Sequence, residues 1–526
     1  MHWKIGSALR FSMFTDSPSD DAKALCEAFG GIDALLEYCK KSIDTVELHM
    51  IKHNDSPDNV LNAVKKLASY GIAATIHGTI NEADLFFAPY LKLFSAKLQP
   101  HYNITVHPSG TEEDTMRMLK GICDRIENEG YPVHITLENQ RIKGEKAFGI
   151  CDDVTRIVNR ISSRHLSCCF DFGHQLSNES KYGIDDASKE FISLVKHTHI
   201  HSMYEGRTHF PLDKGKALLE KNLSDLFEAG FEGVLSLELD PARYIGVFDL
   251  KDSFIASVEI LRTAARQVEE KRRMKAFYLN EYPSALMRLM EEFEKNESCA
   301  VLVGHSGYLL KFGDTRIAVD VSPCVVPIEE KEKKLLLDWI NGFDAFVLTH
   351  SHYDHYDTGF FGALDNKLKK FVPDFMSVDA ENTVVTSDKM QYSLGNITIG
   401  FFESGHSLGQ SIVEEYGFCI EYNGEKYLFP TDVRNYDFEY PDFGKVKMLF
   451  AHLWLGKGNA LNLYKNGYVD KFLRYVNGFG AEKVYIAHLY DIHRTIDEMW
   501  SNVHYGILKG SIPDSDTFCV GDIIKL

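Results

Sequence analysis

The sequence predicts an α/β protein in which a (β/α)₈ barrel is followed by a second α/β domain. The chain has 526 residues, which is too long for a single hydrophobic core. Its first half alternates strand-like and helix-like segments, and its second half carries a dense run of histidine and aspartate directly after an apolar strand. These three observations indicate two domains of different architecture.

The first half contains eight strand-like segments that are separated by helix-like stretches. The strand-like segments cover residues 5–11, 45–51, 73–78, 102–107, 133–139, 166–172, 195–201 and 233–239. Helix-like stretches, several of them opened by Ser, Thr or Asp and closed by Gly, cover residues 20–39, 56–70, 111–130, 150–161 and 214–230. Because strands and helices alternate, we expect eight parallel strands to close into a barrel.

Side chains that can bind a metal ion concentrate at the ends of these strands, where barrels place their chemistry. They are His77, His107, Glu138, Asp171, His174, His199, His201 and Glu238. Such residues would be costly inside a barrel core, which branched apolar side chains fill. One histidine at a strand end is usually structural, but a set that converges from six strands predicts a metal site.

The first candidate metal-binding motif of the second half is residues 349–357, which read Thr-His-Ser-His-Tyr-Asp-His-Tyr-Asp. His350, His352, Asp354 and His355 place three imidazoles and one carboxylate within six positions. These ligands suit Zn, Mn or Fe. A solvated polar turn is the alternative, but only 22 of the 526 residues are histidine, so the cluster favours a metal site.

Three further candidate ligands, His406, Asp432 and His488, each end a strand-like segment downstream. The order H-x-H-x-D-H, His, Asp, His resembles the metallo-β-lactamase-fold hydrolase superfamily, and the resemblance implies an αββα domain. It also implies one metal held by His350, His352 and His406, a second held by Asp354, His355 and His488, and Asp432 as a bridge, with Asp354 also the candidate catalytic residue. Two divalent cations, Zn or alternatively Mn or Fe, would activate water for hydrolysis of an ester, lactone or phosphodiester.

Strand-like segments at 301–303, 308–310 and 316–320 precede this motif. We expect His305 and Asp320, which lie beside them, to be structural hydrogen-bonding groups rather than ligands. The stretches 367–379 and 456–467 read as loops or short helices. Basic groups that follow the ligand-bearing loops could hold an anionic substrate, and they are Arg434, Lys457 and His493.

Short fragments of the first half resemble the xylose-isomerase-like TIM-barrel superfamily, which includes sugar epimerases, isomerases and the type-IV apurinic endonucleases (AP endonuclease family 2). The fragments are Val106-His107-Pro108, Thr136-Leu137-Glu138-Asn139, Cys169-Phe170-Asp171-Phe172-Gly173-His174, His199-Ile200-His201, His209-Phe210-Pro211-Leu212-Asp213-Lys214-Gly215 and Ser236-Leu237-Glu238. Resemblance to the epimerases implies one divalent metal, Mn or Mg, on Glu138, Asp171, His199 and Glu238. The two glutamates would act as acid and base, and His174 would orient the substrate.

The endonucleases of this superfamily hold three zinc ions, and most of that ligand set has a counterpart here. The resemblance implies His77 and His107 with Glu138 for the first ion, Glu138, Asp171, His199 and Glu238 for the second, and His174 with His209 for the third. Arg207 stands where those enzymes carry an aspartate, and its guanidinium would repel a third zinc. Arg207 could instead pair with a phosphate or carboxylate of a substrate.

The composition restricts the partners that we expect. A formal net charge of −19 argues against nucleic acid as the main partner. The N-terminus lacks an apolar signal core, and no apolar run is long enough to span a bilayer. The ten cysteines show no paired spacing, which suits a reducing compartment. We therefore expect a cytoplasmic protein without a membrane partner, and the sequence leaves a homo-oligomer open.

We expect the barrel to cover residues 1–275, a helical connector 276–297 and the hydrolase-like domain 298–526. Together the two halves predict a bifunctional metalloenzyme that acts on a sugar-derived small molecule, with isomerisation or epimerisation in the barrel and hydrolysis in the second domain. One alternative is a nucleic-acid processing enzyme, with an endonuclease-like barrel and a phosphodiesterase-like nuclease domain. Another is that one of the two domains is not catalytic.

Overall fold

The computed structural model describes residues 3–142, 148–185, 187–326 and 328–526. Contacts within the chain divide it into two compact units, Met1–Ala265 and Arg266–Leu526. Helix α11 (Leu250–Asn280) runs through this division, and the predicted connector contains its end and helix α12 (Tyr282–Lys295). Within the described residues, no helix combines the length and apolar character that crossing a membrane requires.

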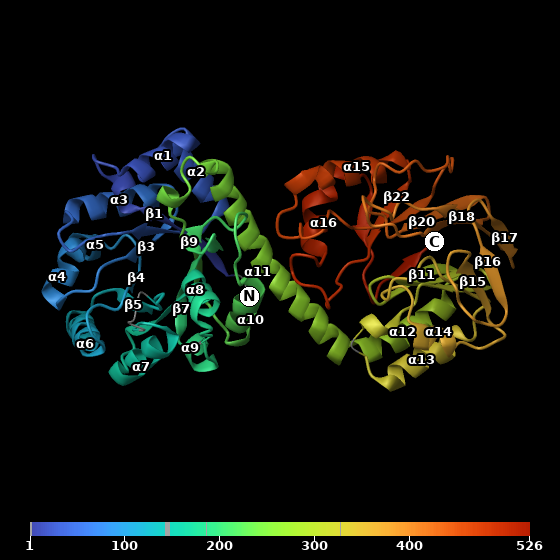
Figure 1. Ribbon diagram of the computed structural model, residues 1–526, viewed down its shortest axis with the longest axis horizontal. Coiled ribbons are helices and arrows are strands. Elements are labelled where there is room, and N and C mark those ends of the chain that lie inside the picture. The colour runs from blue at the N-terminus through green and yellow to red at the C-terminus, as the bar shows by residue number, and fades with distance from the viewer. Residues whose placement is uncertain (1–2, 143–147, 186, 327) are drawn as a thin grey trace. The chain divides into compact units, whose positions relative to one another are not determined.

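The first unit is a closed barrel of eight parallel strands, which confirms the predicted barrel (Figure 1). The strands are β1 (Lys4–Arg10), β2 (Thr45–His49), β3 (Ala73–His77), β4 (Tyr102–Val106), β5 (Val133–Glu138), β6 (Leu166–Asp171), β7 (Val195–Ile200) and β10 (Val234–Leu237). Around the barrel their order is β1-β10-β7-β6-β5-β4-β3-β2. All strands run in one direction, so their carboxyl ends meet at one mouth of the barrel.

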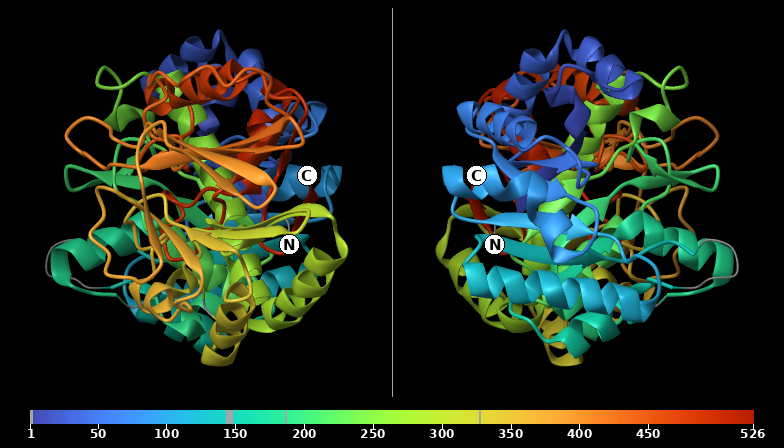
Figure 2. Two further views of the ribbon diagram at one scale, coloured as in Figure 1. Left: turned by 90° about the vertical axis from the view of Figure 1, so that its right-hand side faces the viewer. Right: turned by 90° about the vertical axis from the view of Figure 1, so that its left-hand side faces the viewer.

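Helices lie outside these strands (Figures 1 and 2). They are α1 (Asp20–Phe29), α2 (Ile32–Ser42), α3 (Pro57–Ser69), α4 (Ala83–Phe87), α5 (Leu91–Ala96), α6 (Glu112–Glu129), α7 (Cys151–Ile161), α8 (Phe172–Tyr182), α9 (Lys189–Ser193) and α10 (Leu219–Glu228). The 3₁₀ turns are η1 (Phe11–Phe14), η2 (Ala88–Tyr90) and η3 (Pro241–Arg243). The predicted helix at 20–39 is two helices, because Gly30 and Gly31 adopt φ angles of 89° and 115° that end α1.

Helix α6 shows how the sequence sets these elements. The Thr111 hydroxyl accepts a hydrogen bond from the Asp114 N–H, and the Asp114 carboxylate accepts one from the Thr111 N–H, which is a capping box worth about 1 kcal/mol. The helix ends at Gly130, whose φ angle of 65° suits glycine. Leu119 and Ile126 face the barrel core and are fully buried. Caps and an apolar face together place the helix against the strands.

The second unit contains two seven-stranded sheets. The first has the order β16-β15-β14-β13-β12-β11-β24 and the second β17-β18-β19-β20-β21-β22-β23. The strands of the first sheet are β11 (Ser298–Val303), β12 (Gly307–Phe312), β13 (Thr315–Val319), β14 (Ala345–Val347), β15 (Lys369–Pro373), β16 (Thr383–Thr386) and β24 (Ile523–Lys525). Those of the second are β17 (Gln391–Leu394), β18 (Ile397–Glu403), β19 (Tyr416–Tyr422), β20 (Glu425–Thr431), β21 (Met448–His452), β22 (Lys483–Ala487) and β23 (Ser515–Thr517).

The two sheets share one buried apolar cluster. Leu302 and Leu310 of the first sheet belong to it, as does Phe429 of the second, whose ring stacks 4.6 Å from Phe418 and 4.5 Å from Phe450. A second cluster joins other strand residues to the helices, which are α12, α13 (Glu330–Ile340), α14 (Thr358–Gly362), α15 (Tyr468–Gly478) and α16 (Asn502–Leu508). The unit also has 3₁₀ turns η4 (Pro323–Val325), η5 (Lys465–Gly467) and η6 (Lys509–Ser511). The unit is rich in sheet, and its assignment to the metallo-β-lactamase fold stays a prediction.

Candidate metal centres

Glu138 is the centre of a buried cluster at the mouth of the barrel. It is the last residue of β5 and is fully buried. Three imidazoles from other strands approach its Oε2 atom: His77 Nε2 at 3.2 Å, His107 Nε2 at 3.1 Å and His199 Nδ1 at 2.9 Å. The structure therefore brings together four residues that the sequence places on four different strands or their ends.

Glu238 approaches the same nitrogen of the His199 ring as Glu138 does. Its Oε2 atom is 3.4 Å from His199 Nδ1 and 3.4 Å from His209 Nε2, and its Oε1 atom is 3.3 Å from His49 Nδ1. His209 comes from the hairpin of β8 (Ser202–Tyr204) and β9 (Arg207–Phe210), and its φ angle of 68° is unusual for a residue with a side chain. The Nδ1 atom of His199 thus lies between the two predicted acid–base carboxylates.

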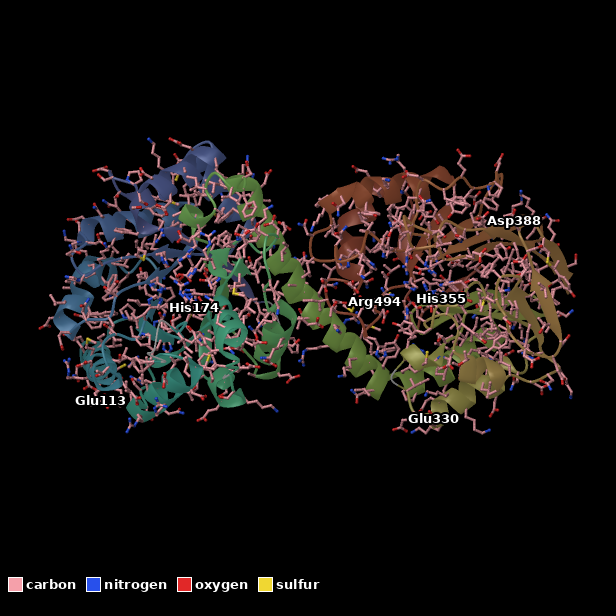
Figure 3. The ribbon with its side chains drawn as sticks, viewed as in Figure 1. Glu113, His174, Glu330, His355, Asp388 and Arg494 are labelled. Atoms are coloured by element: carbon pink, nitrogen blue, oxygen red, sulfur yellow. The ribbon has the colours of Figure 1, made fainter. Side chains whose placement is uncertain are left out.

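Asp171, the last residue of β6, joins this cluster to a second group. Its Oδ2 atom is 3.1 Å from His201 Nε2 and 3.4 Å from His174 Nδ1, and His174 Nδ1 is also 3.3 Å from Glu138 Oε1. Asp171, His174, His201 and His209 offer ligand atoms that all lie within 4.8 Å of one another. Figure 3 shows His174 inside the first unit. All the predicted barrel ligands therefore converge, although their roles as ligands stay predictions.

The two glutamates remain ionised in this buried cluster. Burial by itself would raise the pKa of Glu138, but His107 and His199 outweigh it and hold that pKa well below its usual range. For Glu238 burial is again outweighed, here by His199 and His209, and its pKa also lies well below the usual range. Carboxylates held in this form are ready to bind a cation.

Several ligand atoms at the mouth of the barrel make no hydrogen bond to any residue that the structure describes. They are Glu138 Oε1, His199 Nδ1, Glu238 Oε2 and His49 Nδ1. Buried polar atoms nearly always have a partner, and leaving one unpaired is costly. A divalent cation would satisfy these oxygen and nitrogen donors, so the residues fit the metal that the sequence predicts.

Sequence reasoning missed Glu47 and His49, both in strand β2. The two residues are two positions apart, so their side chains lie on the same face of the strand, the one that points into the barrel. Glu47 is fully buried, and its carboxylate oxygens lie 3.0 Å from His199 Nε2 and 2.8 Å from His197 Nε2. An acidic residue and a histidine inside an otherwise apolar strand were the available signal.

Glu47 fixes which nitrogen of His199 is free. Both oxygens of Glu47 face His199 Nε2, at 3.0 and 3.2 Å, so Nε2 would keep its proton and Nδ1 would give up its proton when a cation binds. The Nδ1 atom is the one that faces Glu138 and Glu238. A carboxylate that holds a ligand histidine in this way typically tunes metal affinity.

We expect Glu47→Gln to weaken cation binding in the barrel by about 10–100-fold. The amide can donate to His199 Nε2 and so place the ring proton on Nδ1, where it would face the cation. The affinity for Mn²⁺ or Zn²⁺ is measured by competition with a chromophoric chelator, in a chain in which His350→Ala and Asp432→Ala silence the second unit. Glu37→Gln, on the exposed side of α2, is the control. Equal affinities in the two variants would contradict the assigned role of Glu47.

The second unit brings the predicted first-metal ligands together. His350, His352, His406 and Asp432 offer ligand atoms that all lie within 4.8 Å of one another. His406 donates from Nδ1 to Glu415 Oε2 at 2.7 Å, and its Nε2 atom is 3.5 Å from Asp432 Oδ2. Glu415, which the sequence analysis missed, therefore orients His406 for ligation.

The predicted second-metal ligands lie around Asp354. Its Oδ2 atom is 3.4 Å from His488 Nε2, 3.2 Å from His305 Nε2 and 4.0 Å from His355 Nε2. The Nδ1 atom of His355 is 2.9 Å from Asp320 Oδ2, which holds the ring with Nε2 toward Asp354. Figure 3 shows His355 inside the second unit. His305 and Asp320 therefore make the hydrogen-bonding contacts that we expect of structural groups.

His452, the last residue of β21, also lies in this cluster and was missed. His355, His452 and His488 offer ligand atoms within 4.8 Å of one another. The Nε2 atom of His452 is 2.7 Å from the Tyr308 hydroxyl, so only Nδ1 faces the cluster as a free donor. The signal was one histidine at the end of an apolar strand, which alone would be read as structural.

The second centre passes the same test for a cation. Among the described residues, four Nε2 atoms make no hydrogen bond, and they belong to His350, His355, His406 and His488. Burial would raise the pKa of Asp432, but His488 and Arg434 hold it well below the usual range. Imidazole nitrogens and ionised carboxylates are the donors that Zn, Mn or Fe would take, so these residues fit the two predicted metals.

Three residues at this centre have a backbone conformation that is rare for residues with side chains. The φ angles of Asp320, Thr431 and His488 are 49°, 65° and 59°. Each such residue costs about 1–3 kcal/mol and persists where the surrounding structure enforces it, commonly at functional sites. The strained residues are a predicted ligand, His488, and two residues that adjoin predicted ligands, Asp320 and Thr431.

Comparison with known proteins supports the barrel assignment. The family model of the xylose isomerase-like TIM barrel matches residues 88–264, which contain most of the candidate ligands of the barrel. The uncharacterized protein MJ1188 of Methanocaldococcus jannaschii is 27% identical over 206 residues, which are 35% of this chain and 73% of that protein. The closed parallel barrel and the family match together support the xylose isomerase-like barrel that the sequence motifs predict.

Two solved structures each resemble a part of this chain distantly. An L-ribulose 3-epimerase is 14% identical, with 51% of this chain and 97% of that chain covered and a TM-score of 0.35. A metallo-β-lactamase fold protein, YhfI from Bacillus subtilis, is 15% identical, with 44% of this chain and 99% of that chain covered and a TM-score of 0.30.

Proposed function

We propose that the barrel is a metal-dependent isomerase or epimerase of a sugar-derived small molecule. The observation that carries this proposal is the pair of ionised carboxylates, Glu138 and Glu238, which both approach His199 Nδ1, at 2.9 and 3.4 Å. A divalent cation held there would chelate a carbonyl and its neighbouring hydroxyl and so acidify the C–H bond between them. One glutamate can then remove this proton, and the other can return a proton to the neighbouring carbon or to the opposite face.

The cavity at the barrel mouth suits a small substrate. Its volume is about 390 Å³, and Glu238 lines it together with His49, His107, His174 and His209. Ligand pockets of this size bury a molecule of sugar dimensions. His107 and His174 can orient hydroxyl groups of that molecule through their ring nitrogens. A substrate in this cavity would lie beside Glu238, and His107 in the same wall contacts Glu138 at 3.1 Å.

The test of this proposal is exchange of substrate C–H hydrogen with solvent. The full chain is loaded with Mn²⁺ and incubated in D₂O with a panel of ketoses and aldoses, and deuterium incorporation is measured by NMR. We expect incorporation next to the carbonyl of at least one sugar and its loss after chelation. Cleavage of an abasic DNA duplex without exchange into any sugar would favour the nuclease instead.

We propose that the second unit is a metal-dependent hydrolase of an ester, lactone or phosphodiester. Its support is the pair of adjoining donor groups, one around His406 and Asp432 and the other around Asp354 and His488. Divalent cations at such a centre lower the pKa of water and so supply a nucleophile at neutral pH. His350, His352, His406 and Asp432 would hold one cation, and Asp354, His355 and His488 the other.

A cavity of about 270 Å³ adjoins this second centre. His352 and Asp354 line it, and so do three cationic residues, Arg434, Lys457 and Arg494. Arg434 donates from Nη2 to Asp432 Oδ2 at 3.1 Å. Arg494 is likewise paired with Asp491, so Lys457 is the cation of this wall that makes no ion pair with a described residue. An unpaired cation next to the ligands favours a substrate or leaving group with negative charge, as a phosphodiester or a sugar acid has. Hydrolysis of such a substrate by the full chain and by the Asp432→Asn variant tests this proposal.

A further inference from the structure

We propose that the substrate of the barrel carries an oxyanion, a phosphate or carboxylate, and that Arg141 binds it. This inference rests on the proposed function, because it assigns a substrate class to the same cavity. Three arginines, Arg10, Arg141 and Arg243, line the cavity that also contains the histidines and Glu238. A neutral sugar has no charge for these guanidinium groups to bind. The carboxylates around each arginine decide which guanidinium group can form an ion pair with a ligand.

Arg10 and Arg243 already have carboxylate partners. Arg10 donates from Nε to Asp21 Oδ2 at 3.0 Å and from Nη2 to Asp240 Oδ1 at 2.9 Å. Arg243 Nε lies 3.2 Å from the other oxygen of Asp240. Asp240 therefore bridges two guanidinium groups and holds them at the wall of the cavity. Neither arginine needs a ligand to balance its charge.

Arg141 is different. Its Nη1 atom donates to the neutral hydroxyl of Thr208 at 3.0 Å, and no carboxylate of the described residues lies within ion-pair distance of it. The side chain is partly buried, and burial together with the nearby Arg243 lowers its pKa. Asp171 and Glu238 attract this guanidinium from a distance and raise its pKa by less than burial and Arg243 lower it. Arg141 is thus a cation at the cavity wall that makes no ion pair with a described residue, and a bound anion would supply one.

The position of Arg141 connects it to the proposed chemistry. It follows Glu138 by three residues, on the loop after β5, and lines the same cavity as His174 and His209. One small molecule can therefore place its reacting carbons near Glu238 and its anionic end at Arg141. A planar guanidinium has the fork geometry that matches phosphate and carboxylate oxygens.

Arg207, the residue that the sequence analysis suggested for an anionic substrate, does not occupy this position. It is exposed, its guanidinium lies over the Phe210 ring at 5.5 Å, and it does not line the cavity. Arg207 and Arg141 therefore form a matched pair of variants, because both are arginines of the barrel mouth loops but only Arg141 faces the cavity.

The test measures binding to the Mn²⁺-loaded full chain by isothermal titration calorimetry, with three probes of one carbon skeleton: a pentulose 5-phosphate, the corresponding pentonate and the free pentulose. We expect at least one anionic probe to bind about tenfold or more tightly than the free pentulose. Arg141→Gln should remove this preference, Arg141→Lys should keep part of it, and Arg207→Gln should keep all of it. The phosphate and carboxylate probes show which oxyanion the site takes.

Three outcomes would overturn the inference: equal binding of the three probes by the unaltered chain, no measurable binding of either anion at millimolar concentration, or a preference that survives Arg141→Gln. Melting temperatures of the variants show whether each one is folded. If Arg141→Gln does not fold, the anion preference of Arg141→Lys is compared with that of the unaltered chain instead. Anion binding through Arg141 without C–H exchange would refute only the isomerase. Exchange into neutral sugars without an anion preference would refute only the role of Arg141.

Discussion

Replacing Glu138 by glutamine is expected to lower the rate of substrate C–H exchange by about 10²–10⁴-fold, the range for loss of a general acid or base. The amide keeps the shape of the side chain but cannot take up a proton, and it is a poorer cation ligand. The fully buried carboxylate is also the group toward which His77, His107 and His199 converge. The rate is measured by NMR of deuterium incorporation from D₂O into the sugar that the panel identifies.

Glu113→Gln is the matched control for this variant. Glu113 lies in helix α6 of the same unit, at its surface (Figure 3). It should leave the exchange rate within experimental error, because surface substitutions of this kind have little effect. Exchange at an unchanged rate in Glu138→Gln would show that this carboxylate takes no part in the reaction and would leave the barrel a supporting role.

The second large effect is expected from Asp432→Asn, which should lower hydrolysis by the second unit by at least about 100-fold. Loss of a group that only orients a metal ligand typically costs 10–100-fold, and Asp432 is a predicted bridging ligand itself. Its carboxylate lies 3.5 Å from His406 Nε2 and 3.1 Å from Arg434 Nη2. The rate is measured with bis(4-nitrophenyl) phosphate and with a sugar lactone, which also separates a phosphodiesterase from a lactonase.

Asp338→Asn, in helix α13, is the control because the Asp338 side chain is 61% exposed and is not one of the candidate ligands. C–H exchange by the barrel should be unchanged in Asp432→Asn, since the two centres are built from different units. Hydrolysis that survives Asp432→Asn would contradict the assignment of Asp432 as a ligand. Loss of both activities would instead indicate a folding defect.

Much of the barrel could be predicted from the sequence, because each strand is a short β-branched or aromatic segment bounded by turn residues. Predicted strands such as 73–78 and 133–139 match β3 (Ala73–His77) and β5 (Val133–Glu138) within one residue. The short helices α4 and α5 were not expected, since helices of five or six residues have too few turns for a periodic pattern.

One segment of the second unit was predicted wrongly. Residues 367–379 were expected to be a loop or short helices, but Lys369–Pro373 is strand β15, paired in parallel with β14 and β16. Two lysines and a proline weaken its local strand signal. The hydrogen bonds that its neighbours supply on both sides determine its structure, and neighbours of this kind are invisible in a local pattern.

Some of the candidate ligands could be predicted from the sequence and others could not. His350, His352 and Asp354 could be recognised because they are close in sequence and share one turn. Glu47 and His452 could not, since each is an isolated polar residue in a strand whose partners, such as His199 for Glu47, are distant in the sequence. The pairing of the strands in the folded structure is needed to show which of these side chains meet.

The metal content of the purified full chain tests the central claim, that each unit forms its own cation site, most directly. Divalent ions are counted by inductively coupled plasma mass spectrometry after loading and gel filtration. We expect about three or more ions per chain, with at least about one lost in Glu238→Ala and at least about one other lost in His350→Ala. A content of about two ions that falls only in His350→Ala, or no bound ions at all, would contradict the account.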